Sequence, residues 1–227
     1  MLRDALVTPW KIRNIIKSTL IYPWVRLLFA VNCIPWEKGW RFYGAPIIQK
    51  HRKSHMSFGP CLQLRSTLRS NPLAPDHPVV LATLRQDASI RTGAGFGMTG
   101  GAICAAKGIF IGDNVVVGAN TIIMDTDFHP IDLARRKTKP NDGECSEVII
   151  EDDVFIGMGC LILKGVIIGN SSVIGAGSIV STDIPPMVVA AGNPARVLKN
   201  LDVKGMKVKS SNPIHYLLNT PRRGNPA

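Results

Sequence analysis

The 227-residue sequence predicts an all-β fold in which short strands stack into a triangular prism, with an N-terminal helical segment and two excursion loops. Ile, Leu and Val make up 60 residues while aromatic side chains make up 6%, a balance that favours aliphatic interiors between stacked strands. The stronger observation is a period of six. Every sixth position is Ile or Val in two series: Ile111, Val117 and Ile123, then Ile150, Ile156, Ile162, Ile168, Ile174 and Val180.

A period of six is neither helical nor the alternation of an ordinary strand. It fits short strands joined by tight corners, three per turn, with each aliphatic side chain pointing into the prism. Glycine often follows the aliphatic residue and supplies the backbone angles that corners require. Residues 150–185 make two full turns of this kind, and residues 111–128 make one more.

The chain divides into three parts. Residues 1–41 form the helical, amphipathic segment, residues 42–198 the strand array with excursions at 66–80 and 127–148, and residues 199–227 a basic tail. Before the regular array, Ile90 and Phe96 fit the period, and Phe58 and Leu64 indicate an opening coil. The first excursion is rich in Pro and turn formers. The array ends near residue 185, because two consecutive prolines cannot continue a sheet ladder.

The N-terminal segment is apolar but interrupted. Residues 18–36 carry Arg26 in the middle and Pro23 near the start, whereas a membrane-spanning helix needs about 20 consecutive apolar residues. Tryptophan interleaved with Lys and Arg is typical of a segment that lies at a membrane surface. A helical cap packed on the rest of the fold is the alternative, and the two can coexist. The residues concerned are Trp10, Trp24, Trp36, Trp40, Lys11, Arg13, Lys17 and Arg26.

The net charge of +11 suits nucleic acid, an anionic membrane surface or a phosphorylated small molecule as partner. No helix-turn-helix, zinc-finger or aromatic RNA-binding pattern accompanies the charge, which disfavours nucleic acid. The five cysteines are scattered without a C-x-x-C pair, and no secretory signal is evident, which favours a reducing cytoplasm. Cys104 and Cys160 are expected to be small buried side chains, with catalysis by Cys104 a weaker alternative.

Three stretches carry a resemblance to a known family. They are "IGDNVVVGANTIIMDTDFHPI" (111–131), "IEDDVFIGMGCLILKGVIIGNSSVIGAGSIVSTDIPP" (150–186) and "AAGNPARV" (190–197). Together they resemble the hexapeptide-repeat acyltransferases, in the branch of galactoside, maltose and nodulation O-acetyltransferases and of polysaccharide-biosynthesis O-acetyltransferases. The resemblance covers about half of the chain. It implies a left-handed parallel β-helix and a homotrimer with active sites between neighbouring prisms. Acetyl-CoA would be the acyl donor, and no metal would take part.

The "DTDFHPID" stretch (125–132), which interrupts the repeat, contains a histidine that could act as a catalytic base. Transfer of an acetyl group from a thioester to a hydroxyl needs a group that takes the hydroxyl proton, and histidine suits this near neutral pH. The family's catalytic histidine falls on His129. Asp127 and Asp125 are candidates for orienting the ring, although either carboxylate could instead cap the turn. A backbone carbonyl would orient the ring equally well.

The resemblance also places the remaining site residues. The oxyanion donor would be the backbone N–H of Met158 or Gly157, with Phe155 as a wall of the site or as plain packing. Ala176 and Ser181 would contact pantetheine. Arg196 and Lys199 would meet the phosphates of CoA, with solvated surface charge as the alternative for both. The acceptor candidates are His77, Asn71 and Asp76 in the first excursion, where a structural turn role for His77 is the alternative.

One departure bears on the acceptor. Galactoside acetyltransferases carry acceptor-binding Asn and Asp before the "IGDN" coil, where this chain reads "GMTGGAICAAKG". We therefore predict an acetyl-CoA-dependent O-acetyltransferase that acts on a sugar hydroxyl of a surface polysaccharide or its precursor. It would be cytoplasmic, with peripheral contact at the inner membrane face. The alternatives are an N-acetyltransferase of a nucleotide-linked aminosugar and a non-catalytic structural trimer. A zinc enzyme is disfavoured, because His51 and His55 lie outside the strict array and His129 stands alone.

Overall fold

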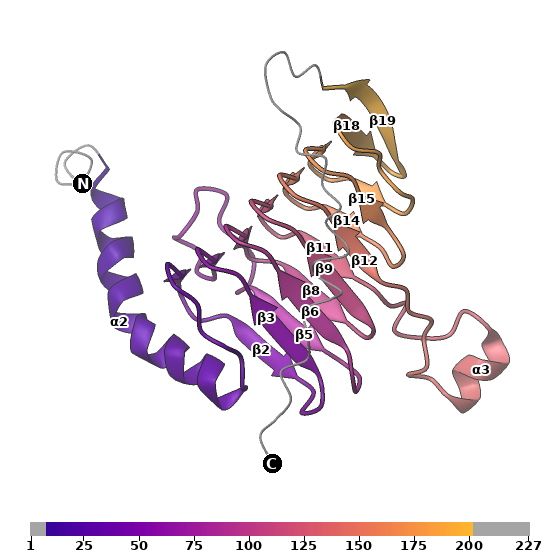
Figure 1. Ribbon diagram of the computed structural model, residues 1–227, viewed down its shortest axis with the longest axis horizontal. Coiled ribbons are helices and arrows are strands. Elements are labelled where there is room, and N and C mark those ends of the chain that lie inside the picture. Colours follow the sequence, from indigo (N-terminus) through magenta and orange to yellow (C-terminus); the bar gives the residue numbers. More distant parts are fainter. Residues whose placement is uncertain (1–7, 202–227) are drawn as a thin grey trace.

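The computed structural model describes residues 8–201, which form three sheets wrapped around a common axis (Figure 1). From β1 to β14, each strand pairs in parallel with the strand three places further along the chain, as β10 pairs with β13 and β13 with β16. The chain thus visits sheets A, B and C in turn, and the fold is the left-handed parallel β-helix that the family resemblance implied.

The strands are short and similar in length. Sheet A contains β1 (Arg41–Tyr43), β4 (Gln63–Arg65), β7 (Gly97–Thr99), β10 (Val116–Val117), β13 (Phe155–Ile156), β16 (Val173–Ile174), β18 (Val188–Gly192) and β19 (Ala195–Asn200). Sheet B contains β2 (Ile47–Lys50), β5 (Val80–Thr83), β8 (Ala102–Ala105), β11 (Ile122–Met124), β14 (Leu161–Ile162) and β17 (Ile179–Val180). Sheet C contains β3 (His55–Phe58), β6 (Ser89–Thr92), β9 (Gly108–Ile111), β12 (Val148–Ile150) and β15 (Ile167–Ile168).

The period-six residues line the interior. Ile111, Ile150 and Ile168 are register partners in sheet C, and the corresponding columns in sheets A and B start at Val117 and Ile123. All nine period-six side chains are at most 2% exposed. Each side of the prism takes six residues, so every sixth residue points inward, and the prediction of an aliphatic interior is confirmed.

The N-terminal end of the stack is built from aromatic residues rather than hexads. Helix α2 (Pro9–Val31) lies across this end (Figure 1). Its Phe29 ring lies 5.1 Å from Trp40, 5.4 Å from Phe42 and 6.1 Å from Phe58, measured between ring centroids. Such contacts close an interior that the first coil would otherwise leave open to water. The helical cap considered above therefore exists; the side chains of Trp10, Lys11 and Arg13 lie outside the described residues.

Two segments leave the stack. Residues 66–79 connect β4 to β5, and residues 125–147 connect β11 to β12 and contain the short helix α3 (Leu133–Thr138). Figure 1 shows the segment with α3 projecting from the side of the stack, well away from α2. After β18 the chain turns back as β19 in an antiparallel hairpin that ends the array. Most of the predicted tail, residues 202–227, lies outside the described residues. Within residues 8–201, no helix combines the length and hydropathy that crossing a bilayer requires.

Candidate active site

The stretch that carries His129 leaves the stack at the corner between sheets B and C, which we call the BC corner (residues 51–54, 84–88, 106–107, 125–147, 163–166 and 181–183). Asp125 lies at the point of departure and is fully buried. Its carboxylate accepts hydrogen bonds from the backbone N–H groups of Ala106 at 2.6 Å, Lys107 at 2.7 Å and Gly108 at 2.6 Å. Burial raises the pKa of Asp125 above its ordinary value, and these hydrogen bonds offset part of that effect.

Asp125 therefore caps the corner of the preceding coil, the second of the two roles considered for it. Both of its oxygens are occupied by backbone donors, which removes it as the group that orients His129. Its charge also acts on a neighbour: burial, and to a smaller extent Asp125, raise the pKa of the Cys104 thiol. A thiol whose pKa is raised stays protonated at neutral pH, so Cys104 is a poor nucleophile. Cys160 is buried, as expected.

His129 is exposed on the projecting segment, and its ring is held by a carbonyl. The Nδ1 atom lies 2.6 Å from the Pro140 carbonyl oxygen. A carbonyl can only accept, so Nδ1 carries the proton and the lone pair of the neutral ring is on Nε2. Phe128 precedes His129 in a left-handed conformation with φ of 62°, which turns the chain sharply at this point. The orienting group is thus a backbone carbonyl, the third possibility considered above.

Asp127 does not take that role either. Its carboxylate lies 3.3 Å from the Lys164 ammonium, which comes from the BC corner of the next coil. Both side chains are partly buried, with about a quarter of each exposed. This ion pair ties the start of the projecting segment to the stack, so Asp127 positions the backbone before His129 rather than the ring itself.

The second half of the projecting segment, residues 139–147 (the returning limb), is hydrogen-bonded to a residue of an earlier coil. Arg85 donates to the Gly143 carbonyl at 2.9 Å and to the Asn141 carbonyl at 3.3 Å. Gly143 packs so closely that a Cβ atom there would lie 2.5 Å from the carbonyl carbon of Phe128 and 2.7 Å from the His129 nitrogen. Arg85, Pro140 and Gly143 were not predicted from the sequence. The "NDG" turn signal around Gly143 was visible, but its contact with residue 129 was not.

A second group of candidates lies at the corner between sheets A and B, the AB corner (residues 44–46, 66–79, 100–101, 118–121, 157–160 and 175–178). Gly157 donates its N–H to Ile174 at 2.8 Å within the ladder. That leaves the N–H of Met158 as the candidate oxyanion donor. A Cβ on Gly157 would meet Ala176 at 2.5 Å, so this corner presents small residues and backbone in consecutive coils. Phe155 is 46% exposed and Met158 is 39% exposed, and both offer apolar surface beside the corner.

The acceptor candidates belong to the same corner. Asp76 accepts a hydrogen bond from the Asn120 side chain at 2.9 Å and donates its backbone N–H to it at 3.0 Å. Asn71 uses its side chain within the excursion and toward Thr99 at 3.3 Å. His77 is exposed and its Nδ1 lies 2.7 Å from the Pro78 carbonyl. These contacts fix the excursion against the stack; an additional role in acceptor binding stays a prediction.

The remaining CoA candidates are divided. Arg196 and Lys199 are exposed on β19, and Arg196 is the register partner of Ala191 above the AB corner. Ser181 is exposed at the BC corner, on the side that carries His129. Within one chain, His129 and most of the CoA candidates therefore lie at opposite edges of sheet B. Within residues 8–201, no three His, Cys, Asp or Glu side chains group so as to hold a metal ion.

Parts of the chain are similar to known proteins. Residues 147–182 match the bacterial transferase hexapeptide (six repeats) model, and residues 100–124 match the hexapeptide repeat of succinyl-transferase. The galactoside O-acetyltransferase of Lactococcus lactis is 44% identical over 101 residues, which are 44% of this chain and 46% of that protein. The chain spans about half the length of the curated relatives it matches, between 44% and 58% for the first four.

Solved structures extend the likeness. The maltose O-acetyltransferase of Clostridium difficile is 37% identical, over 55% of this chain and 67% of that chain, with a TM-score of 0.46. AntD, an N-acyltransferase of Bacillus cereus, is 16% identical over 78% of this chain and 88% of that chain, with a TM-score of 0.58, and resembles it in fold alone. The repeat models and the identity to these acetyltransferases show that the chain belongs to the hexapeptide-repeat transferases.

Proposed function

We propose that the protein is an acetyl-CoA-dependent O-acetyltransferase that acts on a sugar hydroxyl. The observation that carries the proposal is the 2.6 Å contact between His129 Nδ1 and the Pro140 carbonyl, on a segment that projects from a hexapeptide-repeat stack. It leaves the lone pair of the neutral ring on Nε2, where it can accept a proton. The relatives named as galactoside and maltose O-acetyltransferases support the same reaction.

The chemistry follows from these groups. Nε2 of His129 takes the proton of the sugar hydroxyl as its oxygen attacks the thioester carbonyl. The N–H of Met158 donates to the oxygen of the tetrahedral intermediate, where negative charge develops. The C–S bond then breaks, and the imidazolium returns its proton to the departing sulfur. Acetyl ester and free CoA thiol are formed, and the ring ends in the protonation state in which it began.

The site is complete only between copies of the chain. His129 and the Met158–Ala176 corner lie on different corners of one prism, so a neighbouring prism would supply the second half. Val116 and Phe155 are register partners in sheet A and are 49% and 46% exposed, which leaves an apolar strip on the outer face of that sheet. We infer a homotrimer in which each acetyl-CoA lies in the groove between two prisms, with Arg196 and Lys199 near its phosphates.

The acceptor belongs to the same proposal. Residues 97–108 contain no Asn or Asp, whereas galactoside acetyltransferases are expected to carry acceptor-binding Asn and Asp at these positions. We therefore propose that the acceptor is a sugar of a surface polysaccharide or its precursor. The enzyme would work on the cytoplasmic side of the membrane that carries such precursors. Asn71, Asp76 and His77 would contact the acceptor from the AB corner.

The test is release of CoA thiol from acetyl-CoA in the presence of glycan acceptors, with product masses read by mass spectrometry. His129→Ala should lower kcat by roughly 10²–10⁴, the usual contribution of a general base. His55→Ala is the matched control, because His55 is exposed on β3, three strands away in sheet C from β12, which follows the projecting segment. A loss below about tenfold for His129→Ala would overturn the base assignment. Acetylation of amino but not hydroxy acceptors would instead establish an N-acetyltransferase.

A further inference from the structure

The outer face of α2 carries a continuous stripe of exposed apolar side chains. At about 100° per residue, six of them fall within an arc of about 120°, along the whole length of the helix. Leu20 is 75% exposed and Trp24 is 59% exposed. The stripe consists of Ile12, Ile16, Leu20, Trp24, Leu27 and Val31.

The stripe points away from the stack. On the opposite side of α2, Val25 and Phe29 are fully buried against the first coil. Because β1, β2 and β3 are the terminal strands of their sheets, α2 covers an end of the stack rather than one of its sides (Figure 1). The apolar stripe therefore faces outward along the axis of the stack, a direction in which no described part of the chain covers it.

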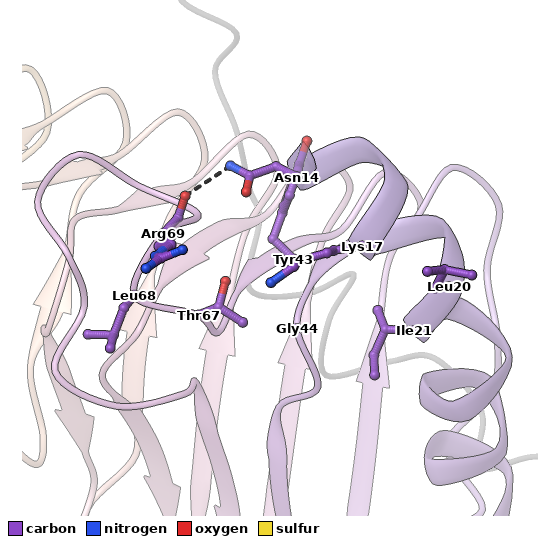
Figure 2. A pocket seen from close by; sticks show the side chains of 9 residues that line it. All are labelled: Asn14, Lys17, Leu20, Ile21, Tyr43, Gly44, Thr67, Leu68 and Arg69. Carbon is purple, nitrogen blue, oxygen red and sulfur yellow. Dashed lines mark hydrogen bonds between the residues drawn. The ribbon is translucent and has the colours of Figure 1, made fainter. Parts of the chain in front are cut away.

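A pocket of about 510 Å³ opens beside this stripe, between α2 and residues 67–69 of the first excursion. Figure 2 shows Lys17, Leu20 and Ile21 on the helix, with Leu68 and Arg69 on the facing segment. The Asn14 side chain donates to the Arg69 carbonyl at 2.9 Å and joins the two walls. Leu20 belongs to both the stripe and the pocket, so the two are parts of one surface. This surface carries apolar side chains, and Lys17 and Arg69 add positive charge at the pocket.

The positive charge beside the stripe indicates which kind of partner binds there. Helix α2 contains Lys and Arg but no Asp or Glu, and Lys17 and Arg26 lie within about 40° of the two edges of the stripe. A second copy of this face would bring like charges together, whereas an anionic lipid surface complements them. Exposed Trp and aliphatic side chains flanked by cations are the composition that inserts at the headgroup boundary.

We propose that α2 docks on an anionic phospholipid bilayer, with its apolar stripe in the headgroup boundary and a lipid phosphate held in the pocket between Lys17 and Arg69. The long axis of the stack then stands on the membrane through its N-terminal end. The projecting segment with His129 lies on a side of the stack and stays accessible. This docking does not depend on acetyl transfer, so its test needs neither acetyl-CoA nor an acceptor.

The experiment is co-sedimentation of the full chain with vesicles of phosphatidylcholine alone or with 30% phosphatidylglycerol. Wild type should bind the anionic vesicles and not the neutral ones, and binding should weaken in high salt because the Debye length shortens. Lys17→Gln with Arg69→Gln should weaken binding roughly 25-fold, because each near-surface cation contributes about fivefold. Leu20→Gln with Trp24→Gln should weaken it on the order of tenfold or more, since apolar burial is lost.

The control is Lys137→Gln with Lys139→Gln, which removes the same charge from the projecting segment and should leave vesicle binding within about twofold. Equal loss in this control would overturn the proposal, because binding would then follow net charge alone. Unchanged binding in both test variants would overturn it as well. If light scattering without vesicles shows that Leu20→Gln with Trp24→Gln dissociates an assembly, the stripe is an interface between copies. Full competition by millimolar glycerol 3-phosphate would point to a soluble phosphate instead of a bilayer.

Discussion

Replacement of Gly143 by alanine should test how the position of His129 is set. Gly143 is buried on the returning limb of the projecting segment, and it is not among the residues with positive φ. Alanine therefore costs nothing in backbone conformation, and any effect must come from the added methyl group. That group would lie 2.5 Å from the Phe128 carbonyl carbon and 2.7 Å from the His129 nitrogen, where ordinary contact begins at 3.4 Å.

The segment must then yield by about 0.9 Å, the shortfall between 2.5 Å and ordinary contact at 3.4 Å. Displacement of a catalytic group by about 1 Å costs roughly 100-fold in rate, so kcat should fall by about that factor. The CoA candidates lie mostly at the AB corner, so KM for acetyl-CoA should change little. Steady-state thiol release at saturating acceptor measures both constants.

Ser57→Thr is the matched control, because it adds one methyl group to an exposed side chain on β3 of sheet C, away from the apolar strip of sheet A. It should leave kcat within about twofold of wild type. Thermal unfolding of both variants, followed by circular dichroism, separates displacement from loss of the fold. Equal kcat for Gly143→Ala and Ser57→Thr, with both proteins folded, would refute the reasoning that this limb positions the base.

Two further predictions follow from the site. Asp125→Ala leaves three backbone N–H groups without their acceptor, so the free energy of unfolding should fall by about 3 kcal/mol or more, measured by urea denaturation; an unchanged midpoint would show that this cap does not stabilise the fold. Mixed and refolded His129→Ala and Ala176→Trp chains should recover about a quarter of wild-type activity, because some neighbouring pairs unite an intact base with an intact CoA corner. Absence of any recovery would contradict a site shared between copies.

The interior of the prism could be predicted from the sequence because the repeat is local. Each hexad places one aliphatic residue inward by the geometry of a single strand and corner, so all nine positions from Ile111 to Val180 followed from spacing. The first coil shows no such spacing. Its interior is filled by Trp40, Phe42 and Phe58 under Phe29 of α2, contacts that only folding brings together.

The candidate site, too, could be predicted from the sequence only in part. The interruption of the repeat, the chemistry of histidine and the family resemblance make His129 the candidate base, and this role stays a prediction. The roles of the two aspartates could not be separated by sequence, because both stand within four residues of His129 and both could cap or orient. Burial decides between them: Asp125 binds three backbone donors of the preceding coil, and Asp127 binds Lys164.

The sequence by itself determined the repeating core, the place where it is interrupted and the residue type that the interruption carries, because these depend on neighbours along the chain. Only the tertiary structure decided that Pro140 orients the ring, that Arg85 and Gly143 hold that limb, and that the base and the Met158 corner lie on different edges of one prism. These relations join residues that are distant in sequence and depend on which coils stack. The same holds for the outward stripe of α2, since the stack determines which face of that helix stays uncovered.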